Sequence, residues 1–554
     1  MGPRLRGDER VDLVPDTFDY IIVGAGSAGC VLANRLTQDA GTSVLLLEAG
    51  GKPTQRLIDM PIAFTKFDRL PAINWNFVGE PEPYANNRRI DAPRGKVIGG
   101  SSRINGMVYA RGHRLDYDDW AQRGLKGWGY ADVLPYFKRS ETHWAGESKY
   151  HGGSGELVVR VPDQNQMFKE LEQATVNAGY PKTDDYHGEQ TEGAQRSEVT
   201  VTRGGRRGAT SRVFLEPALK RPNLTLRSGC LITRVLFEGK RAVGVEYEQD
   251  GQLKTAHAGK EVILSGGTIS SPQILMLSGI GPAEHLREVG IEPLVDLPGV
   301  GRNLIEHPFM LIGWQVTAKG VRSELRVDRA VVSVLRWFFF GKGPFATNGA
   351  AGNIFIRTTP DADRPDMQLT CMDIGITGRE IYYPGRKTPA FMLGCGISMI
   401  KQDSRGEITL RSADPHDPPK ILFNLFKEKS DVARMIRGVR AARRIYRSEP
   451  LASLIGEEIT PGDALQTDEQ LEEHIRNTAA ITLHPVGACK MGVETDPMAV
   501  VDDQLRVRGV EGLRVIDASV MPEVPGGNTN APTIMVAEKG ADLIRGRSLP
   551  RAEV

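Results

Sequence analysis

"FDYIIVGAGSAGCVLANRLTQDAGTSVLLLEAG", residues 18–50, contains two apolar runs separated by a glycine-rich turn and a helical pattern. The first run, Tyr20–Val23, predicts a short strand that leads directly into the sequence G-x-G-x-x-G. Apolar residues at helical spacing follow, and Val44–Leu47 predicts a second strand that ends at Glu48. This order of elements is typical of a βαβ unit that binds a dinucleotide.

Each glycine of this turn has a distinct expected role. Gly24 permits the tight turn, Gly26 lets the backbone approach a pyrophosphate, and Gly29 lets the helix pack on the strand. Glu48 is expected to accept hydrogen bonds from ribose hydroxyls. The pattern does not distinguish NAD from FAD. The neighbours expected to line the same site are Ser27, Ala28 and Ala49.

Composition and length limit the possible classes of protein. A chain of 554 residues predicts two interleaved or successive domains. The formal charge of +1, from 70 basic and 69 acidic residues, gives no indication of a nucleic-acid partner. The five cysteines are scattered and include no C-x-x-C pair, so we expect neither a disulfide framework nor a metal site. A reducing compartment fits this usage best.

Neither residues 1–16 nor the apolar runs of the sequence predict insertion into a membrane. Residues 1–16 carry charges and no apolar core of a secretion signal, so we interpret them as a mobile tail. The apolar cluster 331–341 is interrupted by Arg336 and is too short to span a bilayer. We therefore expect a cytoplasmic protein, with peripheral contact to the inner membrane as the alternative.

Two further segments identify the cofactor by resemblance. "RGKVIGGSSRINGMVYARG" (94–112) and "SGGTISSPQILMLSGIG" (265–281) resemble the two signature segments of the glucose-methanol-choline (GMC) oxidoreductases. The similarity covers about residues 17–547, and within the family it points to the bacterial choline dehydrogenase-like branch of FAD-dependent alcohol dehydrogenases and oxidases. The other matching segments, in the family's order, are "NWNF" (74–77), "RPNLTL" (221–226), "PGVGRNLIEHP" (298–308), "SRGEITLRSADP" (404–415) and "GLRVIDASVMPEVPGGNTNAPTIMVAEKGADLI" (512–544).

The resemblance implies an α/β fold with a Rossmann-like FAD-binding domain. A discontinuous substrate-binding domain built on an antiparallel sheet is expected beside it. The ranges predicted for the FAD-binding domain are 17–160, 200–310 and 480–547. Those predicted for the substrate-binding domain are 161–199 and 311–479.

The resemblance also assigns residues to the cofactor. Those expected to line the isoalloxazine and ribityl chain are Val97, Gly99, Asn105, Gly106, Met107 and Val108. Val235 is expected to face the adenine, with Asp517 and Ala518 near the ribityl chain and phosphate. Asn528 and Thr529 precede a predicted helix, with Asn530 expected as its cap and its positive end directed at the pyrimidine edge of the flavin.

Covalent attachment of the flavin is not expected. Some members of the family link FAD to a histidine of the first signature segment, but the matching positions here run from Ser101 to Asn105 and include Ile104. The resemblance therefore implies FAD held non-covalently.

The segment "HPVGACKMG" (484–492) resembles the family's catalytic loop and implies that His484 removes the hydroxyl proton of an alcohol. Asn528 is implied as the partner that orients the same oxygen. The alternative from the residues alone is that His484 is a packed structural ring. Ala488 stands where the family usually has threonine. We expect His307 and the remaining histidines, which lie outside these loops, to be structural.

The central part of the chain bears on substrate and partners. The helix predicted at 431–448 places five arginines at helical spacing on one face, which favours a solvated face over docking to a membrane or an acidic partner. Residues 335–345, "LRWFFFGKGPF", either line an apolar pocket or pack in the core. No carboxylate is placed to pair with a quaternary ammonium group, so we expect an uncharged primary alcohol as substrate.

Two other classes of function remain open from the sequence. The same scaffold supports lyase or light-driven decarboxylase chemistry, but the decarboxylating relatives lack the catalytic histidine, whereas His484 and Asn528 are both present. A non-catalytic flavin-binding protein is expected to lose one of this pair. The sequence leaves oxygen or a quinone as the electron acceptor.

Overall fold

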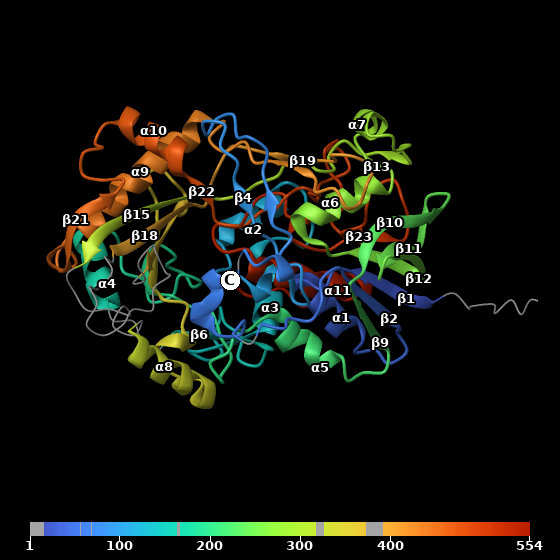
Figure 1. Cartoon of the computed structure of the whole chain (residues 1–554), viewed down its shortest axis with the longest axis horizontal. Helices are drawn as coiled ribbons and strands as arrows, with labels where there is room; N and C mark the ends of the chain where they lie inside the picture. Colours follow the sequence, from blue (N-terminus) through green and yellow to red (C-terminus); the bar gives the residue numbers. More distant parts are fainter. Residues whose placement is uncertain (1–15, 56, 68, 163–166, 317–325, 373–391) are drawn as a thin grey trace, which may run out of the picture.

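A computed structural model of the chain describes residues 16–55, 57–67, 69–162, 167–316, 326–372 and 392–554, so nearly all of the predicted tail 1–16 lies outside the described residues. The fold is mixed α/β with two large sheets that lie toward opposite sides of the molecule (Figure 1). The helices are α1 Ser27–Leu36, α2 Arg114–Gln122, α3 Tyr130–Ser140, α4 Phe168–Asn177, α5 Glu216–Ala218, α6 Gly267–Leu277, α7 Ala283–Glu288, α8 Val327–Phe340, α9 Lys429–Tyr446, α10 Asp468–Thr478 and α11 Asn530–Ile544.

The first sheet contains the predicted βαβ unit, and its strand order is β10-β11-β12-β1-β2-β9, with β23 paired to β12. Strand β1 is parallel to both β2 and β12. The crossover through α1 accounts for the parallel pairing with β2. The predicted strands are therefore confirmed, with β1 three residues longer at its start. The bounds are β1 Thr17–Val23, β2 Val44–Glu48, β9 Leu224–Ser228, β10 Leu231–Glu238, β11 Arg241–Gln249, β12 Gln252–Leu264 and β23 Leu513–Val515.

The second sheet is antiparallel, with the order β21-β15-β18-β17-β16-β7 and β22 paired to β15. The predicted fold class is thus confirmed. Strands β15 and β22 begin within the ranges predicted for the FAD-binding domain, and the division into domains stays a prediction. The bounds are β7 Gly193–Arg196, β15 Pro308–Val316, β16 Ala350–Ile356, β17 Met367–Met372, β18 Met392–Met399, β21 Ile455–Thr460 and β22 Ala480–Ile481.

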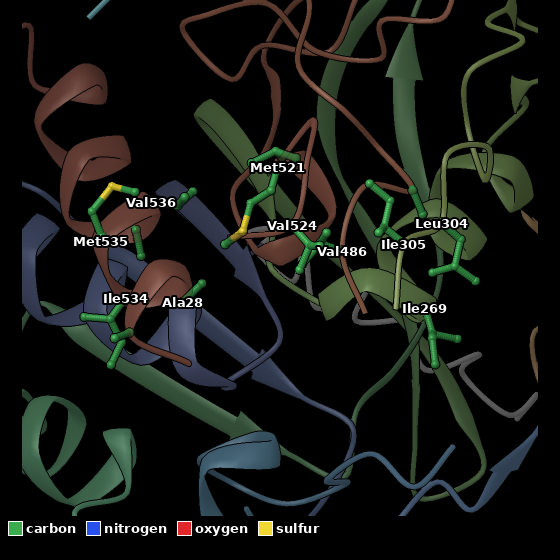
Figure 2. Close-up of a cluster of buried hydrophobic side chains, with 14 of the residues drawn as sticks. Ala28, Ile269, Leu304, Ile305, Val486, Met521, Val524, Ile534, Met535 and Val536 are labelled. Carbon is green, nitrogen blue, oxygen red and sulfur yellow. The ribbon is translucent and has the colours of Figure 1, made fainter. Parts of the chain in front are cut away.

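The core of the nucleotide-binding side joins segments that are distant in the sequence (Figure 2). Ala28 of α1 and Ile534 of α11 are buried where the two helices meet. Arg35 of α1 bonds to the buried carboxylate of Glu538 on α11 at 2.7–3.1 Å. Glu538 is fully buried and also pairs with Arg139, while Arg35 also pairs with Glu156, so the ion pair is part of a network of charged residues. The contact fixes α11 against the first βαβ unit.

The start of one helix differs from expectation. Helix α11 begins at Asn530, so the preceding Thr529 occupies the cap position, and the Asn530 amide oxygen instead accepts a hydrogen bond from the Ser27 hydroxyl at 2.7 Å. Helix α10 begins with a capping box, in which the Thr467 hydroxyl and the Gln470 side chain each bond to the backbone of the other residue. No helix among the described residues is long and apolar enough to cross a membrane.

For residues 335–345 the sequence left two alternatives, pocket lining and core packing. The structure shows both, and it also places three residues in a position that neither alternative included. Trp337 is buried and Phe345 lines the central cavity, as the two readings allowed. Phe338, Phe339 and Phe340 do neither, because their side chains are exposed on the outer side of α8. Apolar residues on both faces of a helix cannot be sorted into inner and outer sets from their spacing alone.

Candidate active site

A cavity of about 1470 Å³ extends from the glycine-rich turn after β1 to the second sheet. Gly26 and Glu48 line one part of it, while His484, Asn528 and Gln368 line another. The cavity is large enough for a dinucleotide and an additional small molecule. Its walls come from both sheets, so the fold brings a nucleotide site and a histidine-containing site together in one continuous space.

The three glycines of the first turn have the geometry that a pyrophosphate site requires. Gly24 has a φ of +100°, a conformation that side chains other than glycine rarely adopt. A Cβ on Gly26 would meet no atom within 4 Å, and the residue lines the cavity at the start of α1. A Cβ on Gly29 would lie 1.9 Å from the Gly24 carbonyl oxygen. Gly26 therefore faces the cavity, and Gly29 sets the contact between helix and strand.

Glu48 lies at the end of β2 with its carboxylate already held by the backbone. Its two oxygens accept hydrogen bonds from the Ala25 and Gly50 amides, both at 2.8 Å. Burial raises the pKa of Glu48 to about 7, although these two bonds and Lys96 favour the ionised form. The residue lines the cavity, so acceptor sites remain for the hydroxyls of a ligand.

The first signature segment packs directly on the glycine-rich turn. The Gly99 amide donates to the Ala25 carbonyl at 2.7 Å, and a Cβ on Gly100 would lie 2.8 Å from the Gly26 Cα. This close contact explains the run of small residues in the segment. The predicted residues that line the cavity are Gly24, Gly26, Ser27, Ala28, Glu48, Ala49, Asn105, Gly106, Met107, Val108, Asp517, Ala518, Asn528 and Thr529.

Four of the predicted cofactor residues do not line the cavity. They are Gly29, Val97, Gly99 and Val235. Val97 is fully buried, and Val235 is buried on β10, where its amide donates to the Ser278 hydroxyl at 2.9 Å. Leu231 and Ile232, at the start of the same strand, line the cavity instead. The contact of Val235 with the adenine stays a prediction.

The start of α11 is directed at the cavity. Asn528, Thr529 and Asn530 all line it, so the unpaired amides of the first helical turn lie close to the same space. Asp517 also lines it, but its carboxylate is occupied by the Gly267 and Ser271 donors on one oxygen and by Ser519 on the other. Asp517 thus holds loops together rather than presenting a free charge.

His484 and Asn528 lie within hydrogen-bonding distance of each other. The Asn528 side-chain nitrogen is 3.0 Å from His484 Nε2, and the Gln368 amide donates to the Asn528 oxygen at 3.4 Å. Gln368 therefore fixes which end of the Asn528 amide faces the histidine. Because Asn528 donates to it, His484 Nε2 carries a lone pair, and the proton of the neutral ring lies on Nδ1.

His307 is the second neighbour of the histidine. The two Nδ1 atoms are 3.3 Å apart and the rings meet edge to face. With the proton on His484 Nδ1, His307 Nδ1 is the acceptor. His307 was expected to be structural, and it does not line the cavity, but its ring contacts His484 directly. The cause is an antiparallel bridge between Ile305 and Val486, which aligns the two segments.

Glu306 and Arg94 hold the backbone of the histidine loop. Glu306 accepts a hydrogen bond from the His484 amide at 2.8 Å, and Arg94 donates to the Leu483 carbonyl at 2.9 Å. Leu483 has a φ of +66°, a strained conformation for a leucine that costs about 1–3 kcal/mol. Burial raises the pKa of Glu306 to about 7, while Arg94 opposes this shift. The loop is therefore held in one conformation by buried polar contacts.

The pKa of His484 is lowered well below its usual value of 6.5. Burial is the main cause, and the neighbouring His307 and Arg94 add to it. Burial also lowers the pKa of His307, to about 3. Both rings are consequently neutral at neutral pH, which leaves His484 Nε2 able to accept a proton.

Several residues of the site were not predicted from the sequence. Glu306 and His307 are part of a segment that carried the family resemblance, but nothing in their spacing indicates contact with His484. Gln368, on β17, belongs to a strand without any recognised motif. The other unpredicted residues that line the same cavity as His484 include Phe64, Arg94, Phe309, Leu311, Asn348, Thr370, Met372, Ser398, Ile481 and Thr482.

Comparisons with known proteins agree with this geometry. Residues 18–309 and 402–537 match the N-terminal and C-terminal models of the GMC oxidoreductases, and the chain belongs to that family. It is an FAD-dependent oxidoreductase that acts on the CH–OH group of its donor. The FAD contacts expected of such a protein fit the cavity, since Gly26 leaves open space at the start of α1 and Glu48 faces it.

The curated relatives are similar along nearly their whole length. The chain is 46% identical to an oxygen-dependent choline dehydrogenase of Stenotrophomonas maltophilia over 96% of this chain and 95% of the relative. It is 45% identical to a protein of the same name from Escherichia coli over 97% of each chain.

The solved structures share the fold at lower identity. A formate oxidase matches with a TM-score of 0.88 at 26% identity, covering 96% of this chain and 98% of that one. Pyridoxine 4-oxidase from Mesorbium loti matches with a TM-score of 0.84 at 26% identity, covering 96% and 100%. None of these relatives supports the lyase or decarboxylase alternative.

Proposed function

We propose that the protein oxidises an uncharged primary alcohol to the aldehyde, with His484 as the general base and Asn528 as the orienting group. The observation that carries this proposal is the contact between Asn528 and His484 Nε2 at the wall of the cavity. Both ring nitrogens have partners in the fold, but the partner of Nε2, Asn528, lines the cavity together with His484. Here the lone pair of Nε2 faces a side-chain amide that an alcohol oxygen can replace or share.

The proton moves along a path set by the two neighbours of the ring. Nδ1 of His484 donates to His307, so only Nε2 can accept the hydroxyl proton of the substrate. Asn528 Nδ2 donates to the same oxygen and holds it in place as its negative charge develops. Glu306, through the His484 amide, keeps the ring from turning away. The chemistry that bound FAD would supply is that of a hydride acceptor for the alcohol carbon.

We propose that FAD is held without a covalent bond. Ile104, at the position where some members of the family carry the linking histidine, is buried and has no reactive group. We also propose that oxygen or a quinone accepts the electrons of the reduced flavin. The location that we propose is cytoplasmic, with peripheral membrane contact.

The substrate class follows from the groups around His484. Phe64, Phe309 and Leu311 supply apolar surface, and Asn348 and Thr370 supply neutral polar groups. The acidic residues among the described lining are Glu48, Asp417 and Asp517, which lie on other segments with their carboxylates bonded to the fold. No carboxylate of the described residues therefore faces a substrate at His484, which favours an uncharged alcohol.

Choline is the second candidate, because the curated relatives are named as choline dehydrogenases. Its trimethylammonium group would need cation–π contact with rings such as Phe64, Phe309 and Phe345, which line the cavity. Such contacts contribute about 0.5–2 kcal/mol each. A cation–π contact of this kind is weaker than an ion pair between the trimethylammonium group and a buried carboxylate.

The experiment compares choline with its carbon isostere, in which a tert-butyl group replaces the trimethylammonium group. The two alcohols have nearly the same shape and differ in charge. Anaerobic stopped-flow measurement of flavin bleaching should give a higher kcat/KM for the isostere and for simple primary alcohols. A clear preference for choline would overturn the substrate class, and the absence of bleaching by any alcohol would overturn the proposed reaction. Admission of air to the reduced enzyme then tests oxygen as acceptor.

A further inference from the structure

The outer face of α8 is apolar and exposed. Val331, Leu335, Phe338 and Phe339 follow one another at intervals of four, three and one residues, which places them on one side of the helix. Their side chains are 55%, 49%, 60% and 69% exposed. Figure 1 shows α8 at the lower edge of the molecule, away from both sheets. No described residue covers this stripe, and single exposed apolar residues do not form such rows by chance.

The opposite face accounts for the attachment of α8 to the fold. Trp337 is buried, and its ring nitrogen donates to the Gly205 carbonyl at 2.8 Å. Ala330 and Trp337 pack in a cluster that includes Met60 and Phe67. The inner face of α8 therefore makes the contacts that hold the helix on the fold. The exposed apolar residues of the outer face need another explanation.

A basic border runs beside the stripe. Arg329 and Arg336 are exposed and lie seven residues apart, so they share one edge of the helix. Lys342 is exposed just beyond its end, and the acidic Asp328 is paired with Arg326 at 2.7 Å. An apolar stripe with a basic edge is the pattern of helices that lie in the surface of anionic membranes.

The five arginines of α9 are a weaker candidate for this contact. Arg434 bonds to Asp431, Arg440 to Asp468 and Arg447 to Asp463. Three of the five charges, including that of Arg447 just after the helix, are thus paired with carboxylates within the fold. A second copy of this chain is also disfavoured at α8, because a two-fold contact would bring the same basic edges together.

We propose that α8 docks the protein on an anionic phospholipid bilayer. Leu335, Phe338 and Phe339 enter the acyl boundary, while Arg329 and Arg336 contact the headgroups. Val334 of the same helix lines the cavity, as do Leu57 and Lys66 on the neighbouring segment. Docking by α8 therefore places one wall of the cavity next to the bilayer.

The test is co-sedimentation of the full, FAD-loaded chain with vesicles at low salt. Wild type should bind vesicles of phosphatidylglycerol and phosphatidylcholine and not vesicles of phosphatidylcholine alone. Leu335→Ser/Phe338→Ser/Phe339→Ser should bind at least about tenfold more weakly, because three apolar side chains no longer enter the lipid. Arg329→Glu/Arg336→Glu should also lose binding, and salt should weaken wild-type binding.

Leu253→Ser is the matched control, because Leu253 is 66% exposed on β12, on another part of the surface. It should bind like wild type. All variants should keep their FAD and their rate of flavin reduction without vesicles. Wild-type protein that stays in solution with anionic vesicles would overturn the proposal, as would a triple variant that binds normally. A wild-type dimer that the triple variant splits into monomers would assign the stripe to self-association instead.

Discussion

The position of one proton on His484 decides what the residue can do. Asn528 donates to Nε2 and His307 accepts from Nδ1, so the basic lone pair is directed at the cavity wall. Buried histidines without such a pair of neighbours can adopt either tautomer. The family resemblance of the sequence predicted His484 and Asn528 as site residues. The role of His307 as hydrogen-bond acceptor follows only from its contact with His484 in the structure.

We predict that His307→Phe slows flavin reduction by roughly tenfold, because the Nδ1 proton of His484 is left without an acceptor in a buried place. His307→Asn should recover much of the rate, since the asparagine oxygen lies near the position of Nδ1. Stopped-flow reduction at saturating alcohol measures both. Equal rates in His307→Phe and wild type would remove His307 from the proton path.

The pH dependence of the reduction follows from the lowered pKa of His484. A histidine is mainly neutral at pH values above its own pKa, and only the neutral imidazole can accept a proton. The limiting rate should therefore be constant above pH 6.5 and fall as the pH is lowered through the depressed pKa. A rate that first rises between about pH 7 and 9 would assign the ionisation to another group.

At the scale of elements, the turn between β1 and α1 is the part of the fold that the sequence predicts best. Its signals are local, because an apolar strand, three glycines and a helix occur within one short segment. The start of α11 was placed one residue late, since Asn530 bonds to Ser27 across the molecule. The outward direction of α8 could not be predicted, because apolar residues occupy both of its faces.

We predict that the same substitution affects FAD binding at one glycine of this motif and folding at another. Gly26→Val should fold but lose FAD, because its side chain would extend into the space next to α1 that is open in the cavity. Gly29→Val should not fold stably, because its Cβ would lie 1.9 Å from the Gly24 carbonyl oxygen. Circular dichroism and bound-flavin absorbance separate the two outcomes. Full FAD content in Gly26→Val would mean that the nucleotide lies elsewhere.

At the scale of the whole molecule, the site exists only after both sheets have formed. His307 and His484 are 177 residues apart, and Gln368 lies 160 residues before Asn528. Sequence spacing carries no signal for such contacts, which depend on how β15, β17 and the loops around them are aligned. The family resemblance predicted the α/β fold and the cofactor, whereas the neighbours of His484 required the structure.

We predict that the purified protein is yellow and that acid or heat releases all of its flavin as FAD. The reason is that Ile104 offers no atom for a covalent link. Absorbance of the supernatant after precipitation measures the released fraction, and chromatography identifies it. Flavin that stays with the precipitated protein would contradict non-covalent binding.

The central claim is that His484 removes the hydroxyl proton of the alcohol, and stopped-flow flavin reduction without oxygen tests it most directly. His484→Ala should keep its FAD, since the ring borders the cavity, and should be reduced at least ~10²-fold more slowly. Asn528→Ala should be slowed less, because proton removal survives. The acid-side pH dependence of wild type should vanish in His484→Ala. A His484→Ala protein with full FAD that is reduced at the wild-type rate would show that the ring is structural and contradict the account.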